Sequence, residues 1–348
     1  MGASFGPTGF HRPGRPLFTG KEVIRLENVS AKKAVPLQPT TTARKKGRNR
    51  LKRYWPLLVM TLPGLIYLFI NNYLPMCGLF IAFKNINYAQ GLFNSPWVGL
   101  SNFKYLFQSS DAFIITRNTI LYNLAFIVIN TAAAIAVAIL LNEIVNKFFL
   151  KLFQTAILLP FMISMVIVGF LVYAILSPET GILNTTILPL FGVKGQDWYQ
   201  VPEVWPAILV IVKLWNQVGY LCIIYLASIV GIDRQYYEAA TLDGATKWQQ
   251  ITRITLPLIK PIIIMMVLFA VGKIFYSDFG LFYQVPMNSG MLYPTTNVID
   301  TYVYRSLITL GDIGMSSAAG FYQSLVGFVL VFLSNYIVRK INPDNALF

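Results

Sequence analysis

The sequence EAATLDGATKWQQITRITLP, from Glu238 to Pro257, is a polar segment between two long apolar runs. Its small residues let the backbone of a partner approach closely, while Glu238 and Asp243 offer carboxylates to donors on that partner. Gly244 predicts a helix stop, because glycine adopts left-handed dihedral angles at little cost. We therefore expect two short helices, one on each side of Gly244, that receive another protein. An ordinary amphipathic surface helix is the alternative interpretation.

The second half of this segment is expected to hold it against the rest of the protein. Ile251, Ile254 and Leu256 predict an apolar stripe that packs on a membrane bundle. Pro257 and Pro261 are expected to end the segment before the next apolar run begins.

The composition indicates a membrane protein. The chain of 348 residues is 55% hydrophobic and only 12% charged, whereas soluble domains contain roughly 25% charged residues. A helix needs about 20 apolar residues to cross a bilayer, and six runs meet this need, so the predicted fold class is an all-α integral membrane protein with six transmembrane helices. The runs are Pro56–Phe83, Asn118–Leu141, Leu152–Leu176, Val204–Val230, Pro261–Phe282 and Ala318–Val338. The first is long enough to be tilted or broken, and Pro63, Gly64 and Pro75 are candidate break points.

Basic residues predict the orientation, since they collect on the cytoplasmic side of membrane proteins. Most of the net charge of +14 lies in residues 1–54, which we expect to form a disordered cytoplasmic tail. A basic stripe is also typical of nucleic-acid binding, but beside a membrane span it is better explained by topology and contact with anionic lipids. Residues 55–345 then form the membrane domain in the cell membrane, with both termini and the loop 231–258 in the cytoplasm.

Catalytic chemistry has little support in the sequence. Cys77 and Cys222 lie in or beside apolar runs and are expected to be packing residues. His11 is the one histidine and lies in the tail, so no histidine is available for a triad or a metal cluster in the membrane domain. No phosphate-binding loop of the Gly-x-x-x-x-Gly-Lys-Ser/Thr type occurs either. We predict that the chain is not an enzyme and holds neither a cofactor nor a metal.

The polar segment resembles the EAA loop of the permease subunits of binding-protein-dependent, type I ABC importers. This resemblance implies an arrangement of six transmembrane helices with a cytoplasmic helical coupling loop. It also implies a second homologous permease subunit, two copies of a cytoplasmic ATPase that bind ATP and magnesium, and an extracellular solute-binding protein. The matching residues, which would couple to the ATPase, are Glu238, Ala239, Ala240, Asp243, Gly244, Ala245, Ile254, Leu256 and Pro257.

A second resemblance concerns the solute. The stretch Pro75 to Phe107 is similar to carbohydrate-importer permeases, especially a branch for complex oligosaccharides, and SPWVGL at Ser95–Leu100 is its most specific part. By the predicted topology this loop lies outside, where its aromatic residues pack over the bundle or near the docked binding protein. An anchor in the membrane interface is an equally good interpretation.

Polar residues inside apolar runs mark a candidate translocation path, because such groups are costly in hydrocarbon. Three interpretations remain open. The groups bind sugar hydroxyls with Trp215 or Tyr220 stacked on a ring, or they only join helices, or Lys213 and Asp278 neutralise one another and leave Lys273 as an excess charge suited to a uronate. In the fourth run the candidates share one helix face, and those of the fifth run are expected at a similar depth. They are Lys213, Trp215, Asn216, Gln217, Tyr220, Lys273, Tyr276 and Asp278.

The predicted function is that of a permease subunit of an ATP-driven importer for an oligosaccharide, with an acidic, uronate-containing one as the more specific hypothesis. A permease for amino acids, peptides or phosphate is the first alternative. A membrane receptor or scaffold that transports nothing is the second, and an ATP-independent channel is another.

Overall fold

The protein is built from helices. The computed structural model describes residues 47–341, and within these residues the only β-type pairing is a single bridge between Lys84 and Trp97. Several short π-helical and 3₁₀-helical stretches join or extend the α-helices. The α-helices are α2 (Gly47–Leu68), α3 (Leu74–Met76), α4 (Gly91–Asn94), α5 (Ser101–Gln108), α6 (Ser110–Asn142), α7 (Lys147–Met162), α8 (Met165–Leu176), α9 (Leu188–Leu190), α10 (Trp205–Val230), α11 (Arg234–Leu242), α12 (Lys247–Gln250), α13 (Leu256–Val271), α14 (Phe279–Gln284), α15 (Tyr293–Thr296), α16 (Ile299–Ile308) and α17 (Ile313–Ile341).

The candidate membrane spans confirm the all-α membrane class. Five helical runs of the described chain are long and apolar enough to cross a bilayer, and the bent pair α7 and α8 makes a sixth if it is counted as one span. The five runs are Tyr54–Phe83, Ser110–Asn142, Pro202–Val230, Lys247–Val271 and Ile313–Lys340.

The chain divides into two compact units, and α2 belongs to the first, which ends at Phe69. α2 begins at Gly47, inside the predicted tail, and it contains Pro56 and Pro63 without ending at either. The helix geometry changes instead to a π-helical stretch, Phe69–Tyr73. Residues 1–46, and with them His11 and most of the predicted tail, lie outside the described residues.

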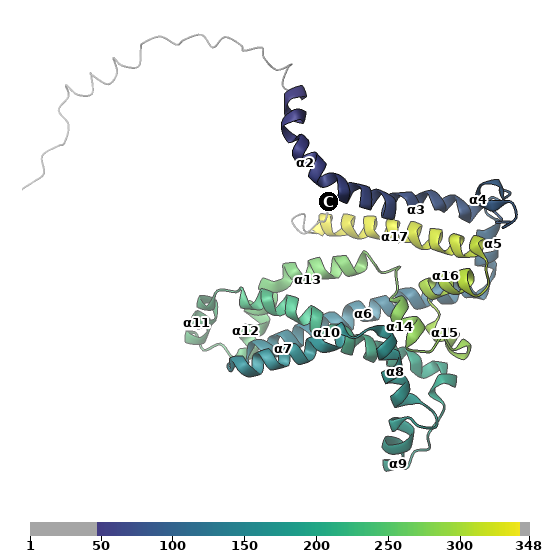
Figure 1. Cartoon of the computed structure of the whole chain (residues 1–348). Coiled ribbons are helices and arrows are strands. Elements are labelled where there is room, and N and C mark those ends of the chain that lie inside the picture. Colours follow the sequence, from purple (N-terminus) through teal and green to yellow (C-terminus); the bar gives the residue numbers. More distant parts are fainter. Residues whose placement is uncertain (1–46, 342–348) are drawn as a thin grey trace, which may run out of the picture. The chain divides into compact units, whose positions relative to one another are not determined.

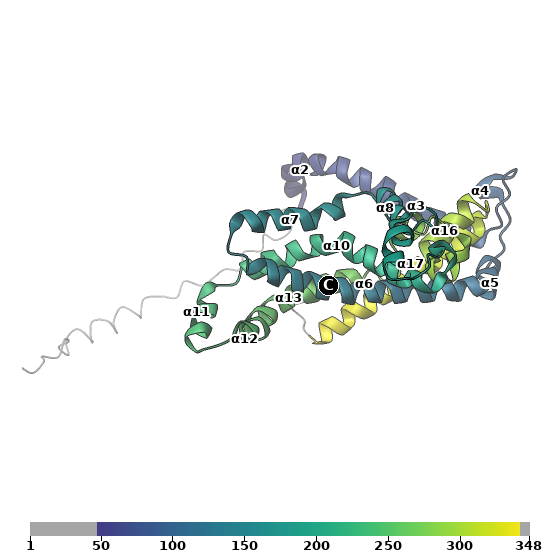
Figure 2. The same cartoon turned by 90° about the horizontal axis from the view of Figure 1, so that it is seen from below.

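In the second unit the long helices form a bundle with the short helices at its two ends. α10 packs against α6, α7 and α13, and α17 packs against α5, α13 and α16. α11 and α12 lie at one end of this unit, while α5, α15 and α16 lie at the other (Figures 1 and 2). Apolar clusters fill the space between these helices, with Trp205, Tyr225 and Phe275 among the most buried side chains.

The third predicted span, Leu152–Leu176, is not one straight helix. α7 and α8 meet at a bend of 97° around Ile163 and Ser164. Pro160 lies in the last turn of α7, where its carbonyl oxygen accepts a hydrogen bond from the Asn216 side chain at 2.8 Å. An interrupted helix is tolerated in an apolar bundle when a neighbouring helix satisfies the freed backbone group. The prediction missed the bend because Asn216 lies far along the chain.

The prediction of the fifth span as one helix, Pro261–Phe282, was wrong for its second half. α13 ends at Val271, and an irregular segment leads to α14, which begins at Phe279. This segment, residues 272–278, is called the break segment below. Asn123 of α6 donates to the carbonyl oxygens of Ile274 (3.0 Å) and Tyr276 (3.3 Å) and so replaces the lost helical hydrogen bonds.

The expected helix end at Pro257 and Pro261 was also wrong. Helix continues from Lys247 to Val271, with a π-helical stretch Ile251–Thr255 between α12 and α13. Pro257 lies in the first turn of α13, where a missing backbone N–H costs least. The π-helical stretch contains Arg253, whose carbonyl the ring of Pro257 would otherwise meet, while Pro261 lies inside α13 without ending it.

Candidate functional site

The polar segment forms two short helices around a tight turn, as predicted. Asp233 caps α11 by accepting a hydrogen bond from the backbone N–H of Gln235 at 3.0 Å. At the other end Gly244 has φ +78°, its N–H donates to the carbonyl of Thr241 (3.1 Å), and the N–H of Ala245 donates to that of Ala240 (2.9 Å). This pair of bonds is the Schellman helix stop, which favours glycine at the left-handed position. Gly244 thus ends α11 and turns the chain toward α12.

A capping box starts α12. The Thr246 hydroxyl accepts from the N–H of Gln249 at 3.3 Å, and the Gln249 side chain accepts from the N–H of Thr246 at 2.7 Å. The Thr-x-x-Gln pattern is readable from the sequence, although it was not used in the prediction. Two local motifs, a glycine stop and a capping box, therefore define the whole turn.

Polar and apolar contacts anchor this element to the bundle. The hydroxyls of Tyr237 and Thr255 are 2.9 Å apart, and the buried side chain of Gln250 donates to Thr241 at 2.9 Å. Leu256 packs on the apolar cluster around α6, α10 and α13, which agrees with the predicted stripe. The Lys247 ammonium lies 2.9 Å from the Glu143 carboxylate at the end of α6.

The outer side of the element is open. A groove of about 400 Å³ runs along it, lined by Ala240, Asp243, Gly244, Ala245, Gln249, Gln250, Arg253 and Ile254. Ile254 therefore borders the groove, although it was expected to pack inward. Glu238, Ala239 and Asp243 are exposed, and Leu242 and Trp248 expose 89% and 72% of their surface. We call residues 234–254 the coupling element. Small, acidic and large apolar side chains face outward on this element.

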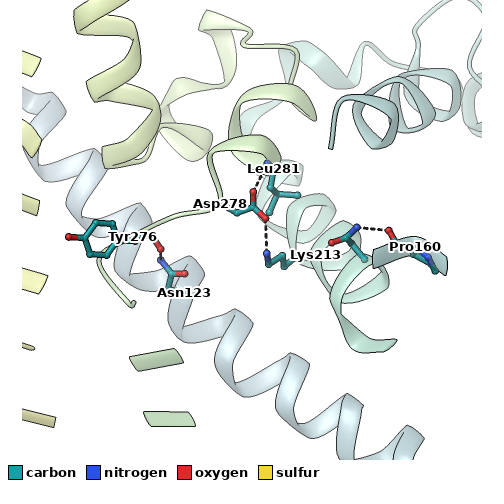
Figure 3. A network of polar contacts seen from close by, with 7 residues as sticks. Asn123, Pro160, Lys213, Tyr276, Asp278 and Leu281 are labelled. Carbon is teal, nitrogen blue, oxygen red and sulfur yellow. Dashed lines mark hydrogen bonds and ion pairs between the residues drawn. The ribbon is translucent and has the colours of Figure 1, made fainter. Parts of the chain in front are cut away.

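A second polar site joins α10 to the break segment. The Lys213 ammonium lies 2.7 Å from Oδ2 of Asp278, and Oδ1 of Asp278 accepts from the N–H of Leu281 at 3.1 Å (Figure 3). Asp278 thereby caps α14. Lys213 and Asp278 therefore lie side by side, and they form the ion pair that one of the three open interpretations expected.

The other candidates of the fourth span differ in their surroundings. Asn216 is buried, and its amide donates to Pro160, which favours a helix-joining role for this residue. Gln217 is half-buried. Trp215 and Tyr220 are exposed on the isolated chain, and Tyr220 stacks on Phe161 with ring centroids 4.8 Å apart.

The candidates of the fifth span lie on and beside the break segment. Lys273 is exposed and makes no ion pair within residues 47–341. The Tyr276 side chain is exposed, while its backbone carbonyl accepts from Asn123 (Figure 3).

The sequence prediction assigned no role to the polar groups that hold the break segment. The Asp300 carboxylate accepts from the N–H of Ser277 at 2.7 Å and from the Gln323 amide at 3.1 Å, and Gln323 also donates to the carbonyl of Phe275 at 2.8 Å. Burial raises the pKa of Asp300, and these hydrogen bonds act against that rise. The spacing of Asn123 and Gln323 along their own helices does not reveal these partners, because the partners lie on other parts of the chain.

The loop from Pro75 to Phe107 packs in part on the bundle. Phe83, Phe103 and Phe321 of α17 form a cluster with ring centroids 5.4–5.6 Å apart. Trp97 stays exposed, with the buried Lys84 ammonium 5.0 Å from its ring. Packing over the bundle thus holds for Phe103, and the exposed aromatic residues remain available for a partner or for the membrane interface.

No cluster of three or more histidine, cysteine, aspartate or glutamate side chains suited to a metal ion occurs in the described part of the chain.

Several known proteins are similar to this chain in sequence. The chain is 32% identical over 299 residues to protein LplB of Bacillus subtilis, which covers 84% of this chain and 92% of that protein. It is also 32% identical over 331 residues to the polygalacturonan/rhamnogalacturonan transport system permease protein YteP of Bacillus subtilis, covering 90% and 98%.

Solved structures show the same fold. A bacterial ABC transporter involved in the import of the acidic polysaccharide alginate matches with a TM-score of 0.77 and 35% identity over 84% of this chain and 98% of that one. A bacterial alginate ABC transporter in complex with an alginate pentasaccharide-bound periplasmic protein matches with a TM-score of 0.76 and 34% identity.

The family model for the inner membrane component of binding-protein-dependent transport systems matches residues 130–343. That range contains the coupling element, the Lys213–Asp278 pair and the break segment. The family model describes a membrane permease component, which agrees with the prediction that the chain is not an enzyme. The chain belongs to the family of inner membrane components of binding-protein-dependent transport systems.

Proposed function

We propose that this ABC importer permease carries an acidic oligosaccharide across the cell membrane. The coupling element carries the proposal, because an exposed helix–turn–helix with a glycine stop is a surface built for a second protein. Likeness to an alginate importer and to a polygalacturonan/rhamnogalacturonan permease supports the acidic solute.

The partner at the coupling element is a cytoplasmic ATPase. The residues proposed to contact it are Glu238, Ala239, Ala240, Asp243, Gly244, Ala245 and Ile254, which are exposed or line the groove. Leu256 instead anchors the element, since it packs on the apolar cluster of the bundle, and Pro257 lies exposed in the first turn of α13. Motion of the ATPase then reaches the bundle through α13, because helix continues without a gap from the coupling element to Val271.

The assembly contains more than this chain. A second, related permease pairs with it, two ATPase copies bind ATP and magnesium, and an extracellular binding protein delivers the solute. Both termini and the coupling element lie in the cytoplasm, as the basic tail and the Arg339–Lys340 end of α17 favour. The solute passes the polar groups at the outer half of α10 and the break segment.

The coupling role is tested by Gly244→Glu in the complex purified from native membranes through a tag on this chain. A Cβ atom at Gly244 meets no atom within 4 Å, but φ +78° strains any residue other than glycine, and a carboxylate there adds charge to the groove. We expect the ATPase to be lost from the complex while the second permease is retained. Gly192→Glu is the matched control, since Gly192 has φ +69° and equally open surroundings away from the coupling element.

The solute class is tested with the same complex in lipid. ATPase activity is measured with binding protein loaded with trigalacturonate, an alginate trisaccharide or maltotriose. Stimulation by an acidic sugar, lost with Gly244→Glu, is the expected result. Stimulation by maltotriose alone would retain the importer and reject the acidic solute, and absence of any ATPase from the wild-type complex would favour a receptor or scaffold.

A further inference from the structure

The ion pair between Lys213 and Asp278 is partly exposed. Their side chains are 13% and 27% exposed at a separation of 2.7 Å, so a solute can approach the pair without unpacking the core. The Lys213 ammonium lies over the buried ring of Phe126, 6.0 Å from the ring centroid. Lys213 is about 12 Å from the start of α10 at 1.5 Å per residue, which places the pair within the membrane part of the bundle.

The two partners differ in the contacts that hold them. Asp278 caps α14 with its second oxygen, and the break segment before it is held by Asn123 and Asp300. Lys213 has a long flexible side chain, and its ammonium donates one hydrogen bond, to Asp278 (Figure 3). Exchange of partners therefore requires movement of Lys213 alone, while Asp278 and α14 remain in place.

We propose that a carboxylate of the transported sugar replaces Asp278 as the partner of Lys213, which makes Lys213 a specificity-determining residue and Asp278 its internal competitor. The inference rests on the proposed import of an acidic oligosaccharide. A charge removed from its partner in a bundle of low dielectric constant is costly, and a uronate carboxylate supplies an equivalent partner, whereas a neutral sugar does not. Asp278 keeps its hydrogen bond from Leu281 after the exchange. When no anionic sugar is bound, Asp278 neutralises the charge of Lys213.

A purely structural ion pair predicts a different pattern of mutant effects. If the pair only joins α10 to α14, removal of either charge weakens the same contact, and both variants change sugar binding in the same direction or not at all. If Asp278 competes with the sugar, the two variants act in opposite directions. Asp278→Asn preserves the cap, because asparagine is a favourable N-cap residue, and it frees the Lys213 ammonium.

The experiment measures binding of radiolabelled trigalacturonate and alginate trisaccharide to the intact complex in nanodiscs, both without nucleotide and trapped with ATP and vanadate. We expect Asp278→Asn to tighten binding of the sugar that the wild type binds, and Lys213→Gln to weaken it by roughly tenfold, the typical value of a charge-assisted hydrogen bond. Lys151→Gln, an exposed lysine of α7, is the control for loss of one positive charge.

The outcomes separate this inference from the proposed function. Opposite changes in the two variants, with Lys151→Gln unchanged, support it. Changes in the same direction, no change, an equal effect in the control, or no binding of either acidic sugar by the wild type would overturn it. Stimulation of ATPase activity by a loaded binding protein is measured separately, so it tests the assignment as an importer independently of this inference. Thermal unfolding of each variant shows whether reduced binding reflects loss of the fold.

Discussion

Gly219 allows α10 to approach α7 more closely than any larger residue permits. A Cβ atom at this position would lie 2.0 Å from the carbonyl oxygen of Ile157. The backbones of α7 and α10 would have to move apart to remove this clash. Close approach of helices at small residues is typical of membrane bundles. The identity of this one side chain therefore sets the spacing between two spans, and it brings Asn216 within reach of Pro160.

We predict that Gly219→Ala destabilises the complex by about 1–3 kcal/mol, the usual cost of overpacking. Gly320→Ala in α17 is the control, because a Cβ atom there meets nothing within 4 Å, and alanine is the better helix former by about 0.5–1 kcal/mol. Thermal unfolding of the purified complex in lipid checks both. Equal melting temperatures for the two variants would contradict the close contact.

At the scale of elements, the coupling element owes its shape to local motifs and its position to tertiary contacts. The capping box of Thr246 and the Schellman stop at Gly244 involve residues no more than five apart in sequence. Tyr237 and Gln250 then tie α11 to the start of the fifth span. The local motifs shape the turn, and these two contacts fix its position on the bundle.

We predict that Thr246→Ala loosens α12 by about 1 kcal/mol, the typical value of an N-cap. Amide hydrogen exchange should become faster at residues 247–250, while the melting temperature of the bundle stays the same. Thr252→Ala is the matched control, since the Thr252 hydroxyl donates only to the carbonyls of Trp248 and Gln249 within its own helical turn. Unchanged exchange in α12 of Thr246→Ala would show that the capping box contributes nothing.

Hydropathy predicted the existence of the six spans but not their interruptions. The length of an apolar run is a local property, and α10 matches its predicted run closely, whereas α6 begins at Ser110, eight residues before the predicted Asn118. The bends in the third and fifth spans depend on Asn216 and Asn123, which satisfy carbonyl groups on other helices. A helical pattern in the sequence contains no information about such donors.

At the scale of the whole second unit, Asp300 connects three parts of the chain. Its carboxylate accepts from Ser277 of the break segment and from Gln323 of α17, and it lies on α16. Burial raises its pKa above that of the unfolded chain. The protonated form therefore favours the folded state, and this contribution is present at acidic pH and lost as the pH rises through the folded-state pKa.

We predict that Asp300→Asn, which keeps an acceptor oxygen without the charge, becomes more stable relative to the wild type as the pH rises. Melting temperatures of the two complexes, measured from acidic to neutral pH, check this trend. The difference should be smallest at the acidic end, where the wild-type carboxyl is also neutral. A difference that is constant over this range, or that shrinks toward neutral pH, would contradict the raised pKa.

The sequence by itself determined the membrane class, the number of spans, the glycine stop of the coupling element and the set of polar residues within the apolar runs. These features follow from hydropathy and from motifs a few residues long, because each depends on near neighbours in the chain. Only the tertiary structure decided that Lys213 pairs with Asp278, that Asn216 and Asn123 support broken helices, and that Asp300 joins three elements. Such contacts link residues that are distant in sequence, and packing of the helices alone brings them within hydrogen-bonding distance.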